Sequence, residues 1–260
     1  MKNLRKLQSI MLALALVLGL VTVSSSNAFA ANSKVIPKAV HIYTQSVDDS
    51  AINLSLAEAG DKIKDIKTSS TNLIAKQTQY NTSSSSQEGT RVNIGLYAKK
   101  DGKYSLTFNI YNKTGEKKES ATITVYANKD HAVKSVTFQD KKIEGLQTVE
   151  SGKVKVTMNT GYKLVKLEYG VEKSSKDESG NINSDTVYKE FKSGDTIRLG
   201  TEAYKSSSSY SYDESDGSKY FNEYLYTSLF AYTHIRVTYI DKYTNEKTES
   251  TYSIYRVAVN

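Results

Sequence analysis

The chain has 260 residues, a formal net charge of +7 and 38% hydrophobic residues, with 20 Tyr, one Pro, no Cys and no Trp. The absence of Cys excludes a disulfide scaffold, a zinc ribbon, an iron–sulfur cluster, a thiol nucleophile and a lipid-anchored Cys. The length allows one or two domains, at about 150 residues per domain.

The first thirty residues have the pattern of a cleaved signal peptide. Three basic residues stand within the first six positions, residues 10–23 are apolar, and the segment ends on Ala28-Phe29-Ala30. A signal peptidase recognises small residues at this spacing. The apolar run is shorter than the roughly 20 residues that a membrane-spanning helix needs. We therefore expect residues 1–30 to be removed after Ala30, leaving a secreted chain with no membrane span.

The signal peptide carries much of the positive charge. Removing it takes away three basic and no acidic residues, which leaves a charge of +4 on residues 31–260. The remaining Lys residues are mixed with Asp and Glu, so we expect no nucleic-acid partner. A mild positive charge favours loose association with an anionic cell wall. The Lys-rich signal and the Cys-free exported chain suggest a Gram-positive bacterium, which is a hypothesis.

After a short leader, residues 31–38, the hydrophobic pattern has a period of two. Such alternation marks strands with one face in a core and the other in water. The clearest runs contain Ile52, Leu54, Leu56; Val92, Ile94, Leu96; Tyr104, Leu106, Phe108, Ile110; Val154, Val156, Met158; and Ile235, Val237, Tyr239. Only residues 57–66 offer a weak helical stripe, so we predict an all-β fold.

Turn chemistry predicts two hairpins among these strands. Residues 112–115 end in Gly115, which can adopt a positive φ at low cost. Residues 242–245 end in Asn245, the next best residue for that conformation.

The chain also repeats its own pattern. The alternating run that begins at Ile52 returns about 101 residues later at Val154, and the strand that begins at Leu106 returns at Ile235. Chance likeness between strands is the alternative explanation. Two matched blocks in the same order favour a duplication.

A duplication divides the mature chain into two units. We predict the first over residues 39–128 and the second over residues 129–260. The spacing of the two matched blocks differs between the units. The second unit is therefore expected to hold about 28 extra residues, between Glu168 and Thr233.

One local feature resembles a known family. Asp101 and Gly102 precede Tyr104, which stands two residues before the core position Leu106. Residues 102–126 resemble the last hairpin of bacterial immunoglobulin-like and PKD-like domains of surface proteins. In immunoglobulin-like domains a Tyr at this place bonds back to the upstream backbone and pins a corner.

That resemblance implies two tandem immunoglobulin-like β-sandwich domains, with about seven strands in each. It carries no catalytic residues, because such domains serve display, spacing and adhesion. The second unit departs from the pattern, since Thr233 stands where Tyr104 would map and Tyr232 lies one residue away. A pinned corner is therefore not expected there.

The residues of common catalytic sites are sparse. His41, His131 and His234 lie far apart in the sequence, and no Gly-x-Ser-x-Gly motif occurs. Carboxylates cluster only in loops such as Asp48-Asp49. We therefore expect no enzymatic activity and no cofactor.

Two acidic loops are weak calcium candidates. The first holds Asp177 and Asp185, and the second holds Asp213 and Asp216. The first lacks the initial ligand and the final bidentate Glu of a calcium loop. Solvated hairpin loops need the same residue types, so we expect no metal at either.

The most unusual stretch spans residues 204–232, rich in Tyr and Ser. Alternation places Tyr210 with Tyr212, and Tyr224 with Tyr226, on one strand face each. Exposed Tyr rings can stack on sugars or form a protein contact. The alternative is that one Tyr of each pair lies in the core. The candidate ligand-binding residues are Tyr210, Tyr212, Tyr220, Tyr224 and Tyr226.

These observations predict a secreted, non-enzymatic binding or adhesion protein that acts at or outside the bacterial cell surface. Its expected partner is an extracellular protein. A carbohydrate-binding module that uses exposed tyrosines is the alternative, although the lack of Trp counts against a dedicated sugar platform. An enzyme or toxin on a β scaffold is the third possibility.

Overall fold

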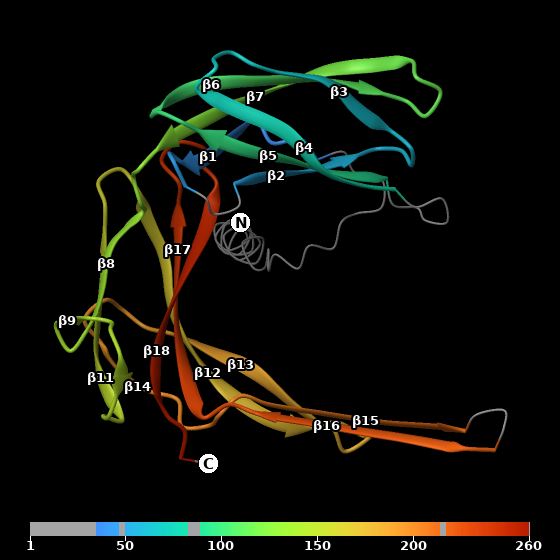
Figure 1. The fold of residues 1–260 in the computed structure, drawn as a ribbon. Coiled ribbons are helices and arrows are strands. Elements are labelled where there is room, and N and C mark those ends of the chain that lie inside the picture. Colours follow the sequence, from blue (N-terminus) through green and yellow to red (C-terminus); the bar gives the residue numbers. More distant parts are fainter. Residues whose placement is uncertain (1–34, 47–49, 83–88, 214–216, 260) are drawn as a thin grey trace, which may run out of the picture.

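A computed structural model describes residues 35–46, 50–82, 89–213 and 217–259. Within these residues the chain forms eighteen strands and no helix (Figure 1), so the all-β prediction is confirmed. The weak helical stripe at residues 57–66 is not a helix, because strand β3 begins at Lys62. No helix that could cross a membrane occurs in this described part. The predicted signal peptide lies outside it.

Strands β1 to β7 form two sheets that face each other. The first has the order β1-β7-β6-β3, and the second has the order β2-β5-β4. The bounds in chain order are β1 (Ala39–Tyr43), β2 (Ala51–Leu56), β3 (Lys62–Thr68), β4 (Leu73–Asn81), β5 (Thr90–Ala98), β6 (Gly102–Tyr111) and β7 (Lys117–Asn128). Strand β1 pairs with β7 in parallel, whereas the other pairings are antiparallel.

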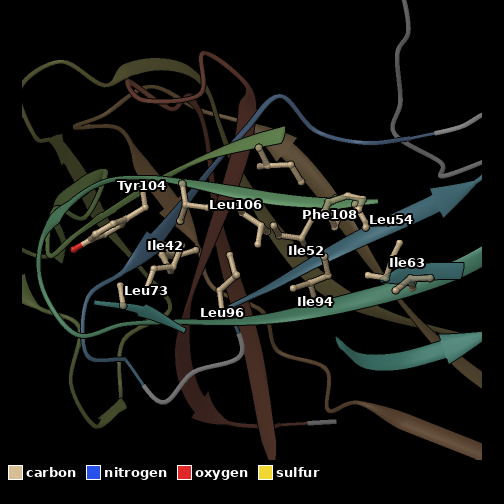
Figure 2. Packing of buried hydrophobic residues seen from close by; sticks show 14 of the residues in the cluster. Ile42, Ile52, Leu54, Ile63, Leu73, Ile94, Leu96, Tyr104, Leu106 and Phe108 are labelled. Atoms are coloured by element: carbon tan, nitrogen blue, oxygen red, sulfur yellow. The ribbon is translucent and has the colours of Figure 1, made fainter. Parts of the chain in front are cut away.

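Alternating residues of both sheets fill one core. Ile94 and Leu106 are fully buried although they belong to different sheets, and Figure 2 shows their side chains in the same cluster with Phe108 and Leu54. Each such side chain stabilises the fold by about 1.5–3 kcal/mol relative to exposure. The alternation read from the sequence therefore identifies the buried face of these strands.

Most of the strands from β8 to β18 form two sheets around a separate core. A five-stranded sheet has the order β10-β18-β17-β12-β13, and a four-stranded sheet has the order β14-β11-β8-β9. Their bounds are β8 (Val133–Phe138), β9 (Lys141–Lys142), β10 (Leu146–Gln147), β11 (Ser151–Met158), β12 (Lys163–Lys176), β13 (Ile182–Glu190), β14 (Thr196–Arg198), β17 (Phe230–Ile240) and β18 (Lys247–Val257). This half has eleven described strands rather than the expected seven or so. The additional strands include β13 and the pair formed by β15 (Lys205–Asp213) and β16 (Lys219–Thr227).

Both predicted turns adopt the expected backbone conformation. Gly115 has a φ of 91° and Asn245 a φ of 59°. The preceding Asn112 side chain accepts hydrogen bonds from the N–H groups of Thr114 and Glu116. In the second turn the Asp241 carboxylate accepts hydrogen bonds from the N–H groups of Tyr243 and Thr244.

The two halves meet where this second turn contacts β1. His41 Nδ1 lies 2.9 Å from Asp241 Oδ2, and its Nε2 lies 3.1 Å from Asn128 Oδ1. The His41 ring also packs on Tyr243, with 4.6 Å between centroids. The Nδ1 bond and the ring contact with Tyr243 therefore hold one half against the other, whereas the Nε2 bond to Asn128 lies within the first half.

Asp130, in the connection between β7 and β8, makes a second set of contacts with the same turn. Its carboxylate accepts from Lys242 Nζ at 2.8 Å and from the Tyr243 hydroxyl at 2.6 Å. Its backbone carbonyl accepts from the Tyr162 hydroxyl at 3.2 Å. Burial raises the pKa of Tyr162, so this hydroxyl keeps its proton and remains a donor.

Candidate binding surface on the β15–β16 hairpin

The tyrosine-rich segment forms one long antiparallel hairpin. It consists of β15 (Lys205–Asp213) and β16 (Lys219–Thr227), inserted in the chain between β14 and β17. Figure 1 shows it extending well away from the sheets of the second half. Neither core cluster contains a residue of this hairpin.

The pairing register places all five candidate tyrosines on the same face. Tyr212 pairs with Tyr220, whereas Tyr224 and Tyr226 pair with Ser208 and Ser206. Directly paired residues share a face, and residues two apart along a strand do too. Tyr210, which pairs with Asn222, therefore joins this row. We call the surface formed by Tyr210, Tyr212, Tyr220, Tyr224 and Tyr226 the tyrosine face.

The tyrosine face is exposed rather than part of a core. Its side chains are between 45% exposed, at Tyr226, and 54% exposed, at Tyr210 and Tyr224. The alternation alone leaves core and surface open as positions for these side chains. Their exposed fractions place all five at the surface.

The rings near the tip of the hairpin are ordered against one another. Tyr210 and Tyr212 lie 6.3 Å apart with an interplanar angle of 2°, and Tyr212 and Tyr220 lie 5.2 Å apart at 18°. Asn222 Nδ2 donates to the Tyr210 hydroxyl at 3.2 Å. Near the base, Tyr204 and Tyr226 are 6.0 Å apart. Three of the five rings, those of Tyr210, Tyr212 and Tyr220, are thus stacked near the tip.

The opposite face is also partly apolar. Phe221 and Leu225 are 68% and 64% exposed, and they pair with Ser211 and Ser207. A two-stranded ribbon has little stability alone in water. Large apolar side chains are therefore exposed on both faces of this ribbon.

The base of the hairpin is fixed to strand β13. Ser184 Oγ donates to the Lys205 carbonyl and accepts from the Lys205 N–H, both at 2.9 Å. Ile182 N–H donates to Ser207 Oγ at 2.7 Å. These bonds set the direction in which the hairpin leaves the second half, while its outer two thirds remain uncovered by described residues.

The other candidate residues lie apart from the tyrosine face or contribute to loops. The Tyr104 hydroxyl donates to the carbonyl of Lys100 at 2.7 Å, the upstream backbone contact expected of a pinned corner. Thr233, at the corresponding place of the second half, is buried and instead accepts from the Gly200 N–H.

The calcium candidates do not converge. Asp177 Oδ1 accepts from the N–H groups of Ser179 and Asn181 within its own loop, whereas Asp185 pairs with Lys173 in the ladder between β12 and β13. Asp213 closes the β15 end of the hairpin, and Asp216 lies outside the described residues. In the described ranges, no group of three His, Asp or Glu is arranged to hold a metal ion.

The comparisons with known proteins add little to this picture. No protein-family model and no curated protein matches the chain. Among solved structures, InvD of Yersinia pseudotuberculosis is 10% identical, with 88% of this chain and 70% of that chain covered and a TM-score of 0.23. The structure named BspA_C_mut is 10% identical, with 80% and 83% covered and a TM-score of 0.19. Both likenesses are too slight to carry an argument.

Proposed function

We propose that this chain is a secreted bacterial binding protein without enzymatic activity, and that its tyrosine face contacts an extracellular protein. The observation that supports this proposal most strongly is the row of five exposed tyrosines on one face of a projecting hairpin. Tyr is enriched at protein interfaces because it offers a large rigid ring with a polar tip at a low entropic cost.

Tandem immunoglobulin-like domains are the scaffold in this proposal. In constant-type immunoglobulin domains the second, fifth and fourth strands share a sheet, and the third, sixth and seventh strands share the other. The sheets β2-β5-β4 and β7-β6-β3 have this order. The parallel pairing of β1 with β7 has a counterpart in the parallel pairing of β10 with β18, which supports the same architecture for the second half.

A matched detail supports the proposed duplication. Gly60 has a φ of 87°, and a Cβ there would lie 3.0 Å from Lys113. Gly161 has a φ of 91°, and a Cβ there would lie 2.9 Å from Lys242. Gly60 follows β2, and Gly161 follows the matching strand β11. Each glycine lies against a Lys from the turn of the last hairpin in its own half.

The chemistry of the tyrosine face favours a protein over a small ligand. Its residues lie along strands that are each nine residues long, about 30 Å at the usual rise. A specific protein contact covers about 800 Å² per partner, which an extended ribbon can supply. The serines that face the tyrosines keep the surface soluble and adaptable.

A carbohydrate remains the second candidate on one specific observation. The nearly parallel rings of Tyr210 and Tyr212 offer flat faces on which sugar rings could stack. Such a site would need polar groups beside the rings. Asn222 is one such group, because its side-chain amide donates to the Tyr210 hydroxyl.

One experiment separates the two classes. Residues 31–260, labelled with a fluorophore, would be applied to an array of extracellular proteins and to a printed glycan array. Binding to spots on the protein array, with loss of that signal in a Tyr210/Tyr212/Tyr224/Tyr226→Ser variant, supports the proposal. If binding on both arrays is unchanged by the four substitutions, the tyrosine face is not the contact surface.

A further inference from the structure

We infer that the chain has a second binding site, a hollow on the outer face of the sheet β2-β5-β4 that takes a neutral glycan. The hollow has a volume of about 700 Å³ and is lined by residues of all three strands. Ligand sites in proteins commonly span about 300–1,000 Å³. It lies in the first half and shares no residue with the tyrosine face.

The hollow arises because two of the three residues in the middle row of the sheet face, Ala51 and Gly95, have little or no side chain. Gly95 of β5 pairs with Ala51 of β2 on one side and with Lys76 of β4 on the other. Ala51 and Lys76 are exposed, and Lys76 lines the hollow with a long, flexible side chain. The row therefore leaves a trough across the three strands.

A bulge in β4 shapes the floor of the trough. The register shifts between Gln77 and Gln79, which turns Thr78 toward β5. A Cβ on Gly95 would lie 2.8 Å from the Thr78 methyl group, so only glycine admits this Thr beside the trough. Bulges that re-aim a side chain are frequent next to functional sites.

One wall of the trough offers oriented amides. Asn93 pairs with Gln79 in the register, and Asn93 Nδ2 donates to Gln79 Oε1 at 2.7 Å. The backbone carbonyl of Asn93 also accepts from the Thr78 hydroxyl at 3.4 Å. Beyond this bond, the two side-chain amides carry the acceptor oxygen Asn93 Oδ1 and three N–H donors.

The opposite wall is apolar. Tyr97 and Ile74 pair directly between β5 and β4, and they are 39% and 48% exposed. A half-exposed Tyr ring beside an aliphatic side chain can cover the C–H face of a sugar ring. The trough is therefore apolar along one side and rich in amides along the other.

This division selects the chemical class of the ligand. An apolar molecule would leave the Asn93–Gln79 amides without partners, which costs about 1–3 kcal/mol per buried group. Sugar hydroxyls both donate and accept, as the amides do. Lys76 is the only charged residue among the described lining residues. The walls therefore offer no cluster of charges that could offset the desolvation of an ionic ligand.

The test uses residues 31–260 on a printed array of neutral and acidic oligosaccharides, followed by calorimetric titration with the best neutral binder. Ala51→Trp fills the trough from an exposed position, and Asn93→Ala removes the amide. We expect each to weaken binding at least about tenfold, or about 1.4 kcal/mol. Tyr224→Ala, on the tyrosine face, should stay within about twofold. Thermal unfolding of every variant shows that it is folded.

Three results would overturn the inference. The first is an array on which no neutral glycan, or only acidic ones, is bound. The second is unchanged affinity in folded Ala51→Trp and Asn93→Ala proteins. The third is loss of glycan binding in Tyr224→Ala alone, which would move the sugar to the tyrosine face. Failure of the tyrosine face to bind a protein leaves the trough unaffected, because the two sites are substituted separately.

Discussion

His41 and Asp241, 200 positions apart, form a direct hydrogen bond that joins the two halves of the molecule. The distance from His41 Nδ1 to Asp241 Oδ2 is 2.9 Å, and the two side chains are only 10% and 7% exposed. The other oxygen of Asp241 accepts from the N–H groups of Tyr243 and Thr244. One carboxylate therefore both shapes the last turn and fixes it against β1.

Replacing this carboxylate should loosen the joint. Asp241→Ala leaves His41 Nδ1 and two turn N–H groups without their acceptor, and we expect a loss of about 1–3 kcal/mol in the free energy of unfolding. Urea denaturation measures this loss of unfolding free energy. Asp130→Ala is the matched control, because Asp130 contacts the same turn but is 53% exposed, so its loss should stay below about 1 kcal/mol. Equal, small losses in both variants would argue against Asp241 as the main fastening.

The same carboxylate should make stability depend on pH. Burial alone would raise the pKa of Asp241, but the N–H groups of Thr244 and Tyr243 and the His41 side chain outweigh it and hold the pKa below the usual 3.8. A lowered folded-state pKa adds stability that is complete above the unfolded-state pKa and is lost as the pH falls through the folded-state value.

The difference between wild type and Asp241→Asn isolates this contribution. Urea titrations at a series of pH values should give a constant difference in unfolding free energy above about pH 5, and a shrinking one below about pH 4. A difference that stays the same down to pH 2.5 or so would show that Asp241 has no lowered pKa in the folded protein.

Tyr104 should stabilise the first half through its hydroxyl. That group donates to the Lys100 carbonyl at 2.7 Å while the side chain is 8% exposed. Tyr104→Phe is expected to cost about 0.5–1.5 kcal/mol. Tyr224→Phe, at an exposed position, should change stability by less than about 0.5 kcal/mol. Thermal and urea unfolding would compare the two, and a neutral Tyr104→Phe would refute the pinned corner.

The hairpin should be dispensable for folding. Lys205 and Thr227 pair directly at its base, so residues 206–226 can be replaced by the turn dipeptide Asn-Gly. Neither core cluster loses a residue, and we expect cooperative unfolding within about 1 kcal/mol of the wild type. Circular dichroism and urea denaturation check this. A shortened chain that no longer folds would mean that the hairpin supports the second core.

Much of the strand layout could be predicted from local pattern. The alternation from Tyr104 to Ile110 identifies the buried face of β6, because each residue's direction depends only on its neighbours along the strand. Gly115 and Asn245 could be assigned to turns because a positive φ restricts the residue type. These features need no knowledge of the partner strand.

Features that depend on pairing escaped the sequence. The pattern placed Tyr210 with Tyr212 and Tyr224 with Tyr226, but only the register across the hairpin brings both pairs to one face. A shift of one residue would have separated them. The trough at Gly95 requires three strands and a bulge, and the contact between His41 and Asp241 requires both halves. No local signal encodes such contacts.

The most direct test of the tyrosine face is a titration of the strongest ligand found on the protein array. Three proteins are compared: wild type, Tyr210/Tyr212/Tyr224/Tyr226→Ser, and Phe221/Leu225→Ser on the opposite face. Loss of several buried aromatic anchors commonly costs 2 kcal/mol or more. We therefore expect Kd to rise at least about thirtyfold in the tyrosine variant and to stay within about threefold in the opposite-face variant. An unchanged Kd in a folded tyrosine variant would contradict the assignment of this face as the binding surface.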